Sequence, residues 1–220
     1  MITKINGDLS VKGVDISRYQ KGIDYKSLKN DGVKFVIIRA GCSLDTDSVF
    51  EEHVKGCITA GIDYGYYWYS KAADPNSVLS EAAACLKAIG QFPAPTYPVF
   101  FDGEENSIAE SVGKEGMTKI ALMFVAAIEN GGYPAGIYAS SDWLQNKYDS
   151  SEFTDRVDLW LASWTDDPYR KPTKNFGQVM WQWGVTNYKM DVDADIFFVD
   201  YPAQTKKWYA DHADNHKTVK

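Results

Sequence analysis

Two carboxylates stand two residues apart where an apolar run ends, in Phe100-Phe101-Asp102-Gly103-Glu104-Glu105. In an extended strand, residues i and i+2 point to the same face with Cα atoms roughly 6.5 to 7 Å apart, so Asp102 and Glu104 are expected to share a face. Repulsion between two such charges raises the pKa of one acid, which then stays protonated near neutral pH and can donate to a leaving group. Cleavage of a glycosidic bond needs such a pair. The same local sequence also fits a strand end without catalytic function, whose acids are solvated or cap the next helix.

Composition excludes several other classes of protein. The chain has 220 residues, of which 45% are hydrophobic, and this is enough for one sizeable core. Its net charge of −7 argues against a nucleic-acid partner, because binding to phosphates requires clustered Lys and Arg. The sequence has neither a signal-peptide pattern at its start nor a run of 18 apolar residues. We therefore expect synthesis in the cytoplasm and no membrane insertion.

Cysteine and histidine usage predicts no metal and no disulfide framework. Cys42, Cys57 and Cys85 are odd in number and lack the C-x-x-C spacing of structural zinc sites. His212 and His216 stand at i and i+4, but no third ligand accompanies them. The motifs of serine hydrolases, nucleotide-binding loops and dinucleotide-binding folds are also absent, so no cofactor is expected.

A second group of acids lies near the end of the chain, in Asp191-Val192-Asp193-Ala194-Asp195. Alternation places its three carboxylates on one face of an extended segment, which suggests calcium. An EF-hand loop, however, needs Gly at the sixth position and Glu at the twelfth, where this chain has Ile196 and Pro202. The remaining interpretations are a catalytic or supporting Asp near the last strand and a solvated turn.

Short apolar runs recur along the chain and predict eight strands, the number that closes a barrel. The stretches between the first five can be helical, and Gly61, Gly90 and Gly131 follow three of them as C-terminal stops. The helical signal fades after residue 140. This alternation predicts a parallel sheet and an α/β barrel with few helices in its last third. The expected strands are 14–16, 35–39, 64–69, 98–102, 136–139, 159–162, 179–183 and 196–198, and the expected helices are 24–31, 48–60, 76–90 and 115–130.

In such barrels the reactive groups lie at the C-terminal ends of the strands. Aromatic residues make up 14% of this chain, and sugar rings stack on aromatic faces while Tyr and Trp hydrogen-bond the ring substituents. A saccharide groove is the natural inference. Trp160 and Trp181 alternate with core-like neighbours and are expected to pack instead. The polar and aromatic residues at or just beyond predicted strand ends are Tyr69, Asp102, Glu104, Tyr138, Trp164 and Trp183.

Several runs together resemble glycoside hydrolase family 25, the muramidases of bacteria and their phages. They occur in family order over nearly the whole chain, and the ordered set is far more specific than any one run. The matching runs are GVDISRYQ at 13–20, FVIIRAG at 35–41, PVFFDGE at 98–104, GIY at 136–138, WLASW at 160–164, WQW at 181–183 and VDADIF at 192–197.

The resemblance implies a single irregular (β/α)5β3 barrel that hydrolyses the β-1,4 bond between N-acetylmuramic acid and N-acetylglucosamine in bacterial peptidoglycan. By position, Glu104 matches the proton donor, Asp102 its ionised partner, and Asp15 and Asp193 two further site acids. Gly103 stands where the family usually has an apolar residue, and Trp183 where it often has Tyr. The expected substrate-binding residues are Tyr67, Tyr69, Tyr138, Trp164, Trp183, Gln182 and Arg39.

The sequence leaves the attacking group and the class of function open. The resemblance implies retention of configuration, with attack either by the substrate's own N-acetyl oxygen or by Asp102. A wall-binding module without turnover and a chitinase-like barrel are the competing functions. The longer chitinase signature D-x-x-D-x-D-x-E is missing before Glu104.

The sequence also predicts how the enzyme reaches the wall and where its domain ends. Lack of an export signal favours a phage endolysin, freed by a holin-type partner, over a secreted autolysin. We expect the catalytic barrel to occupy residues 1–200, and residues 201–220 to form a terminal helix or a linker that can lead to a wall-binding module.

Overall fold

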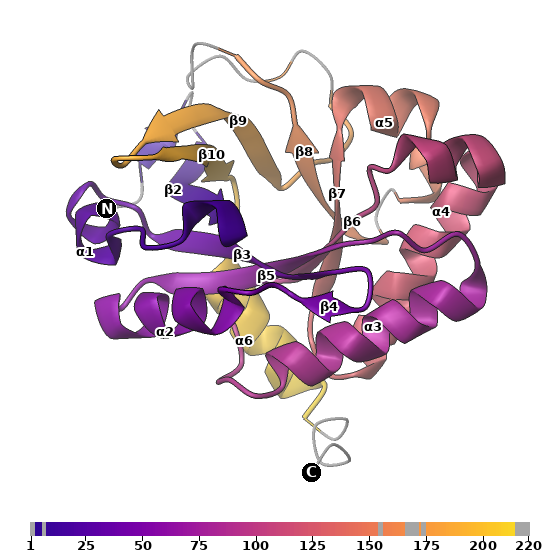
Figure 1. Ribbon diagram of the computed structural model, residues 1–220. Coiled ribbons are helices and arrows are strands. Elements are labelled where there is room, and N and C mark those ends of the chain that lie inside the picture. Colours follow the sequence, from indigo (N-terminus) through magenta and orange to yellow (C-terminus); the bar gives the residue numbers. More distant parts are fainter. Residues whose placement is uncertain (1–2, 6–7, 154–155, 166–171, 173–174, 214–220) are drawn as a thin grey trace.

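The computed structural model describes residues 3–5, 8–153, 156–165, 172 and 175–213. Eight strands close into a barrel with helices on its outside (Figure 1), in the order β2-β3-β5-β6-β7-β8-β9-β10, and β10 returns to pair with β2. The strands are β1 (Thr3–Ile5), β2 (Asp8–Ile16), β3 (Phe35–Cys42), β4 (Asp45–Thr46), β5 (Asp63–Tyr69), β6 (Val99–Asp102), β7 (Ala135–Ser140), β8 (Asp158–Ala162), β9 (Met180–Asn187) and β10 (Asp191–Phe197). The α-helices are α1 (Tyr25–Asn30), α2 (Phe50–Ala60), α3 (Pro75–Ile89), α4 (Asn106–Asn130), α5 (Ser141–Asn146) and α6 (Tyr201–Asp211), and the 3-10 turns are η1 (Arg18–Gln20) and η2 (Ser150–Glu152).

The element order confirms the predicted barrel of five strand–helix units followed by three strands. One helix, α5, was not predicted; it is only six residues long and buries Trp143 and Leu144. Helix α4 bends at Gly113, whose φ of 69° is not helical, so the predicted helix 115–130 is its second part. No helix in the described ranges is long and apolar enough to cross a bilayer.

The prediction of a parallel sheet is right for the barrel strands β2, β3 and β5 through β9, and it is wrong for β10. Strand β10 runs antiparallel to both of its neighbours, β9 and β2. The reason is the short connection between Asn187 and Asp191, in which Lys189 adopts a left-handed φ of 70°. A parallel pair needs a crossover of a dozen or more residues, and a turn this tight can only make a hairpin.

Local sequence explains where the main helices begin and end. The side chain of Asp74 accepts the N–H groups of Asn76 and Ser77 and so caps α3, whose first residue is Pro75. Helix α2 ends at Gly61, whose φ of 63° is left-handed, the conformation in which glycine carries no Cβ penalty.

The interior of the barrel is filled with aromatic rings at its base, the end where the parallel strands begin. Phe35 stacks on Tyr97 at 4.7 Å between ring centroids, and Phe197 contacts Tyr201 of α6 at 4.5 Å. Helix α6 thus closes this end, and the Tyr209 hydroxyl donates to the Pro95 carbonyl there. At the other end, which we call the mouth, the side chains that point inward are polar.

Candidate active site

The acid pair lies at the mouth, but the chain does not continue as a strand between the two residues. Strand β6 ends at Asp102, and the N–H of Glu105 donates to the Gly103 carbonyl at 2.8 Å, which closes a tight turn. A Cβ at position 103 would lie 2.5 Å from the Phe101 ring, so this path of the backbone requires glycine. This turn is centred on Glu104, so it does not test whether Asp102 and Glu104 share a face, and the same-face expectation stays a prediction.

Both carboxylates lie at the mouth, where a separate element holds Glu104. Its Oε1 accepts the backbone N–H of Ser140 at 2.7 Å, and Ser140 is the N-cap of α5. Asp102 Oδ1 accepts the Glu104 N–H at 3.3 Å, and the Tyr69 hydroxyl donates to the Glu104 carbonyl at 3.3 Å. Burial, and then the charges of Asp102 and Glu104, raise the pKa of Tyr138 well above its usual value.

Electrostatics distinguishes the two members of the pair. Burial, and then the charge of Glu104, raise the pKa of Asp102 well above its usual value. Burial also raises the pKa of Glu104, but the hydrogen bonds from Ser140 favour its ionised form. The two acids thus differ in their hydrogen-bond partners: the Ser140 N–H donates to Glu104, whereas the Glu104 N–H donates to Asp102.

Asp15 and Asp193 face each other across the β2–β10 pair, where their Cα atoms are in register. Because β10 is antiparallel, its start lies at the same end as the C-terminal ends of the parallel strands, and this brings Asp193 to the mouth. Burial, followed by the charge of Asp193, raises the pKa of Asp15 to about 7. Burial also raises the pKa of Asp193.

Gln182 connects Asp15 to the aromatic rim. Its Nε2 donates to Asp15 Oδ2 at 2.8 Å, and its Oε1 accepts both the Tyr138 hydroxyl and the Trp164 indole N–H at 3.0 Å. Trp164 is 61% exposed, so the hydrogen bond fixes its edge while its ring faces remain open for stacking. Trp183 is half-buried beside a bulge in β9, and its carbonyl accepts the Thr165 N–H.

Arg39 and Tyr67 lie deeper in the mouth. The Arg39 Nε donates to Asp47 Oδ2 at 2.6 Å, its guanidinium lies 5.3 Å from the centre of the Tyr19 ring, and its charge opposes the rise in the pKa of Asp102. Burial, with the charges of Asp15 and Asp102, holds the pKa of Tyr67 well above its usual value. The phenol is therefore a neutral hydrogen-bonding group among the acids.

The sequence of residues 14–192 matches the family described as glycosyl hydrolases family 25. The chain belongs to this family. It is 38% identical over 68 residues to the autolytic lysozyme of Clostridium acetobutylicum, a match that covers 30% of the chain and only 21% of that relative's length. It is 27% identical over 199 residues to the N,O-diacetylmuramidase of Arthroderma benhamiae, covering 86% of the chain and 82% of the relative. The solved structure of a muramidase from Trichobolus zukalii has a TM-score of 0.76 at 27% identity and covers 90% of this chain and 99% of that one.

In this family 25 barrel, all eleven residues singled out from the sequence lie on the strands of the barrel or just beyond their ends at the mouth. Trp160 and Trp181 are 2% and 1% exposed, which confirms that they pack. Sequence reasoning missed Ser140 and Asp47, which hold Glu104 and Arg39. The Ser140-Ser141 step at a strand-to-helix junction is an N-cap signal, but only the fold reveals that the cap also binds Glu104.

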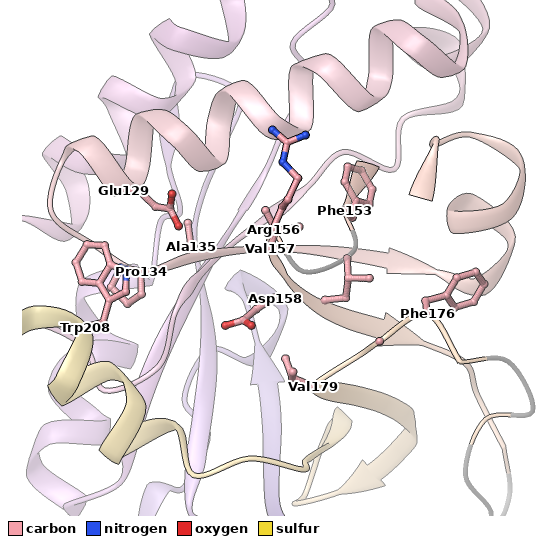
Figure 2. Close-up of a pocket in the computed structure, with 12 residues that line it drawn as sticks. Glu129, Pro134, Ala135, Phe153, Arg156, Val157, Asp158, Phe176, Val179 and Trp208 are labelled. Carbon is pink, nitrogen blue, oxygen red and sulfur yellow. The ribbon is translucent and has the colours of Figure 1, made fainter. Parts of the chain in front are cut away.

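A pocket of about 360 Å³ opens at the base of the barrel, away from the acid pair (Figure 2). Glu129 of α4, Asp158 at the start of β8 and Trp208 of α6 line it, and none of the residues singled out from the sequence does. In the described part of the chain, no group of three or more His, Cys, Asp or Glu side chains is placed to hold a metal ion.

Proposed function

We propose that this family 25 enzyme hydrolyses the β-1,4 bond between N-acetylmuramic acid and N-acetylglucosamine in bacterial peptidoglycan. The observation that carries the proposal is the acid pair, Asp102 and Glu104, at the mouth of the barrel on the side of the exposed Trp164 ring. The named activities of the relatives, a lysozyme and two muramidases, support the same bond and polymer.

The acid step requires one proton on the pair, held by Glu104. An N-acetyl N–H of the substrate that donates to Asp102 favours the ionised form of Asp102, and the proton then moves to Glu104 within the pair. Glu104 gives it to the glycosidic oxygen as the bond from that oxygen to the anomeric carbon breaks. A water molecule later adds its hydroxyl to that carbon and returns a proton to Glu104.

We assign retention of configuration to this reaction, with the N-acetyl oxygen attacking the anomeric carbon while Asp102 orients the amide. Direct attack by Asp102 is the alternative, and product analysis in deuterated water together with trapping of a glycosyl-enzyme separates the two routes. Asp15 and Asp193 would stabilise the oxocarbenium-like charge, since an anion opposite a developing cation lowers its energy. Trp164, Tyr138 and Gln182 would hold the sugars.

The experiment that tests the function is digestion of purified peptidoglycan by the parent and by Glu104→Gln. We expect the parent to release soluble fragments whose new reducing ends are N-acetylmuramic acid, and the variant to lose activity by roughly 10²- to 10⁴-fold. Glu129→Gln, a half-buried glutamate at the base, is the matched control and should retain the parental rate. If Glu104→Gln digested peptidoglycan at the parental rate, Glu104 would not be the proton donor.

Product identity separates this function from its competitors. Binding to walls without new reducing ends would indicate a binding module, and release of N-acetylglucosamine oligomers from chitin would indicate a chitinase-like enzyme.

We also infer that the enzyme is made in the cytoplasm and reaches the wall through a membrane-opening partner of the holin type. Expression in a susceptible bacterium with and without a separate membrane-permeabilising protein tests this; lysis without it would contradict the inference.

A further inference from the structure

Asp195 is a fifth acid of the mouth that the proposed mechanism leaves without a role. Its side chain points into the barrel and is 0% exposed. One oxygen, Oδ1, accepts the Trp160 indole N–H at 2.9 Å. The other, Oδ2, is also buried, and no N–H or O–H group of the described residues donates to it. The carboxyl group of Asp15, which lies two residues beyond the partner of Asp195 on the neighbouring strand β2, also acts on Asp195.

Two ionised carboxylates in this position would be costly. An ionised Asp only accepts hydrogen bonds, so Asp15 and Asp195 would repel each other and leave Oδ2 buried without a donor. A single proton on Asp195 Oδ2 removes both costs, because the neutral acid becomes a donor to Asp15. Asp15 is the natural acceptor, since its own Oδ2 already takes a hydrogen bond from Gln182 Nε2 at 2.8 Å.

We propose that Asp195 is a positioning residue, a permanently neutral acid whose O–H bonds Asp15 and thereby orients Gln182 and the Trp164 ring for the substrate. The donors then point consistently along one connected network. Trp160 donates to Asp195 and Asp195 to Asp15, which also receives the Gln182 amide, while the Gln182 carbonyl receives Tyr138 and Trp164.

The groups around Asp195 agree with this assignment. Asp15 on β2 and Asp193 on its own strand are the charged groups that act on it, while Trp160 on β8 and Gln182 on β9 are neutral. Burial, and then the charge of Asp15, hold the pKa of Asp195 well above its usual value, and the hydrogen bond from Asp195 favours the ionised form of Asp15.

Substitutions at Asp195 separate a neutral donor from a charge. Asn keeps a carbonyl for Trp160 and an N–H for Asp15, whereas Leu keeps the approximate size and removes both. The inference rests on the proposed function, so rates are measured on purified peptidoglycan. We expect Asp195→Asn to stay within threefold of the parental kcat/KM and Asp195→Leu to fall by roughly 100-fold, the scale of a misplaced site. Asp158→Asn and Asp158→Leu, at the base of the barrel (Figure 2), are the matched controls and should leave kcat/KM unchanged.

Two outcomes overturn the inference. If kcat/KM of Asp195→Asn falls as far as that of Asp195→Leu, a charge at position 195 is required. If a folded Asp195→Leu keeps full activity, the hydrogen-bond network is not required for activity. A parent without activity would instead refute the proposed function. Infrared difference spectra at pH 7.5 give a readout that depends on neither turnover nor the Leu variant. The spectrum of the parent minus that of Asp195→Asn should contain the band of a protonated carboxyl group. Absence of this band would show that Asp195 is not neutral.

Discussion

The mouth and the base of the barrel are built by the same strands and have opposite chemistry. On β3, Phe35 contributes to the base and Arg39 to the mouth; on β10, Phe197 contributes to the base and Asp195 to the layer beneath the mouth. The base consists of aromatic rings in contact, and burial of such rings stabilises the fold. The mouth buries several carboxyl groups, which costs stability unless they are neutral or hydrogen-bonded. Function is thus concentrated where the interior is least favourable for folding.

The largest expected effect at the mouth comes from Asp102→Asn. The amide has nearly the same shape but holds no titratable proton to share with Glu104, so activity on peptidoglycan should fall by roughly 10²- to 10⁴-fold. Stability should stay level or rise, because a buried acid with a raised pKa is removed. Rates and thermal unfolding midpoints check both parts. If Asp102→Asn lowered the unfolding midpoint and left the rate unchanged, the mouth would contribute to stability and not to activity, the reverse of what we expect.

Phe197→Ala tests the base. Phe197 is fully buried and contacts the rings of Phe35, Tyr97 and Tyr201. Its loss should lower the free energy of unfolding by about 3–5 kcal/mol, measured by urea unfolding. At temperatures where the variant is folded, kcat should stay within about twofold of the parent, since only the base is altered. A parallel loss of kcat would show that packing at the base sets the geometry of the mouth.

The division between what the sequence predicted and what it missed follows from the range of the interactions. Apolar runs such as 35–39 predicted the strands, because burial in a barrel wall imposes a local pattern. The direction of β10 depended on the short turn at Lys189, and this residue is not a glycine that would mark such a turn. The apolar pattern of a strand carries no information about the direction of its neighbour.

The site shows the same limit at the level of single side chains. Asp102 and Glu104 were found by local spacing, but strand β6 ends at Asp102, so the turn that follows sets the position of Glu104. The groups that fix the acids come from distant segments: Ser140 lies 36 residues after Glu104, and Trp160 lies 35 residues before Asp195. Local patterns identified the acids, and only the fold identified what holds them.

The buried acids of the mouth should also affect how stability depends on pH. The pKa of Asp15 rises from 3.8 to about 7 on folding, so the folded protein binds this proton more tightly than the unfolded chain does. The resulting stabilisation is complete below about pH 4 and is lost as the pH rises through about 7. For three pKa units it amounts to at most about 4 kcal/mol.

Comparison of the parent with Asp15→Asn isolates this contribution from that of surface acids such as Asp24 and Asp74, whose lowered pKa values act in the opposite direction. Urea unfolding at several pH values between 4 and 8 should show a smaller decline in the variant. Equal slopes in both proteins would mean that Asp15 has an ordinary pKa in the folded state. Asp158 and Glu129 at the base, whose pKa values burial also raises, contribute a decline of the same sign, and Asp15→Asn leaves that part in place.

The smallest effect that still separates the two ends comes from two tryptophans. Trp164→Ala removes the exposed ring at the mouth, and loss of a stacking contact of about 0.5–1.5 kcal/mol predicts a rise in KM of up to about tenfold, with kcat and the unfolding midpoint nearly unchanged. Trp208→Ala is the matched variant at the base, where the ring stacks on His212 at 4.1 Å; it should lower the unfolding midpoint and leave KM unchanged. Steady-state kinetics on peptidoglycan and thermal unfolding measure both. If Trp208→Ala raised KM as much as Trp164→Ala, the base would also take part in binding the polymer, and the two ends would not divide stability from function.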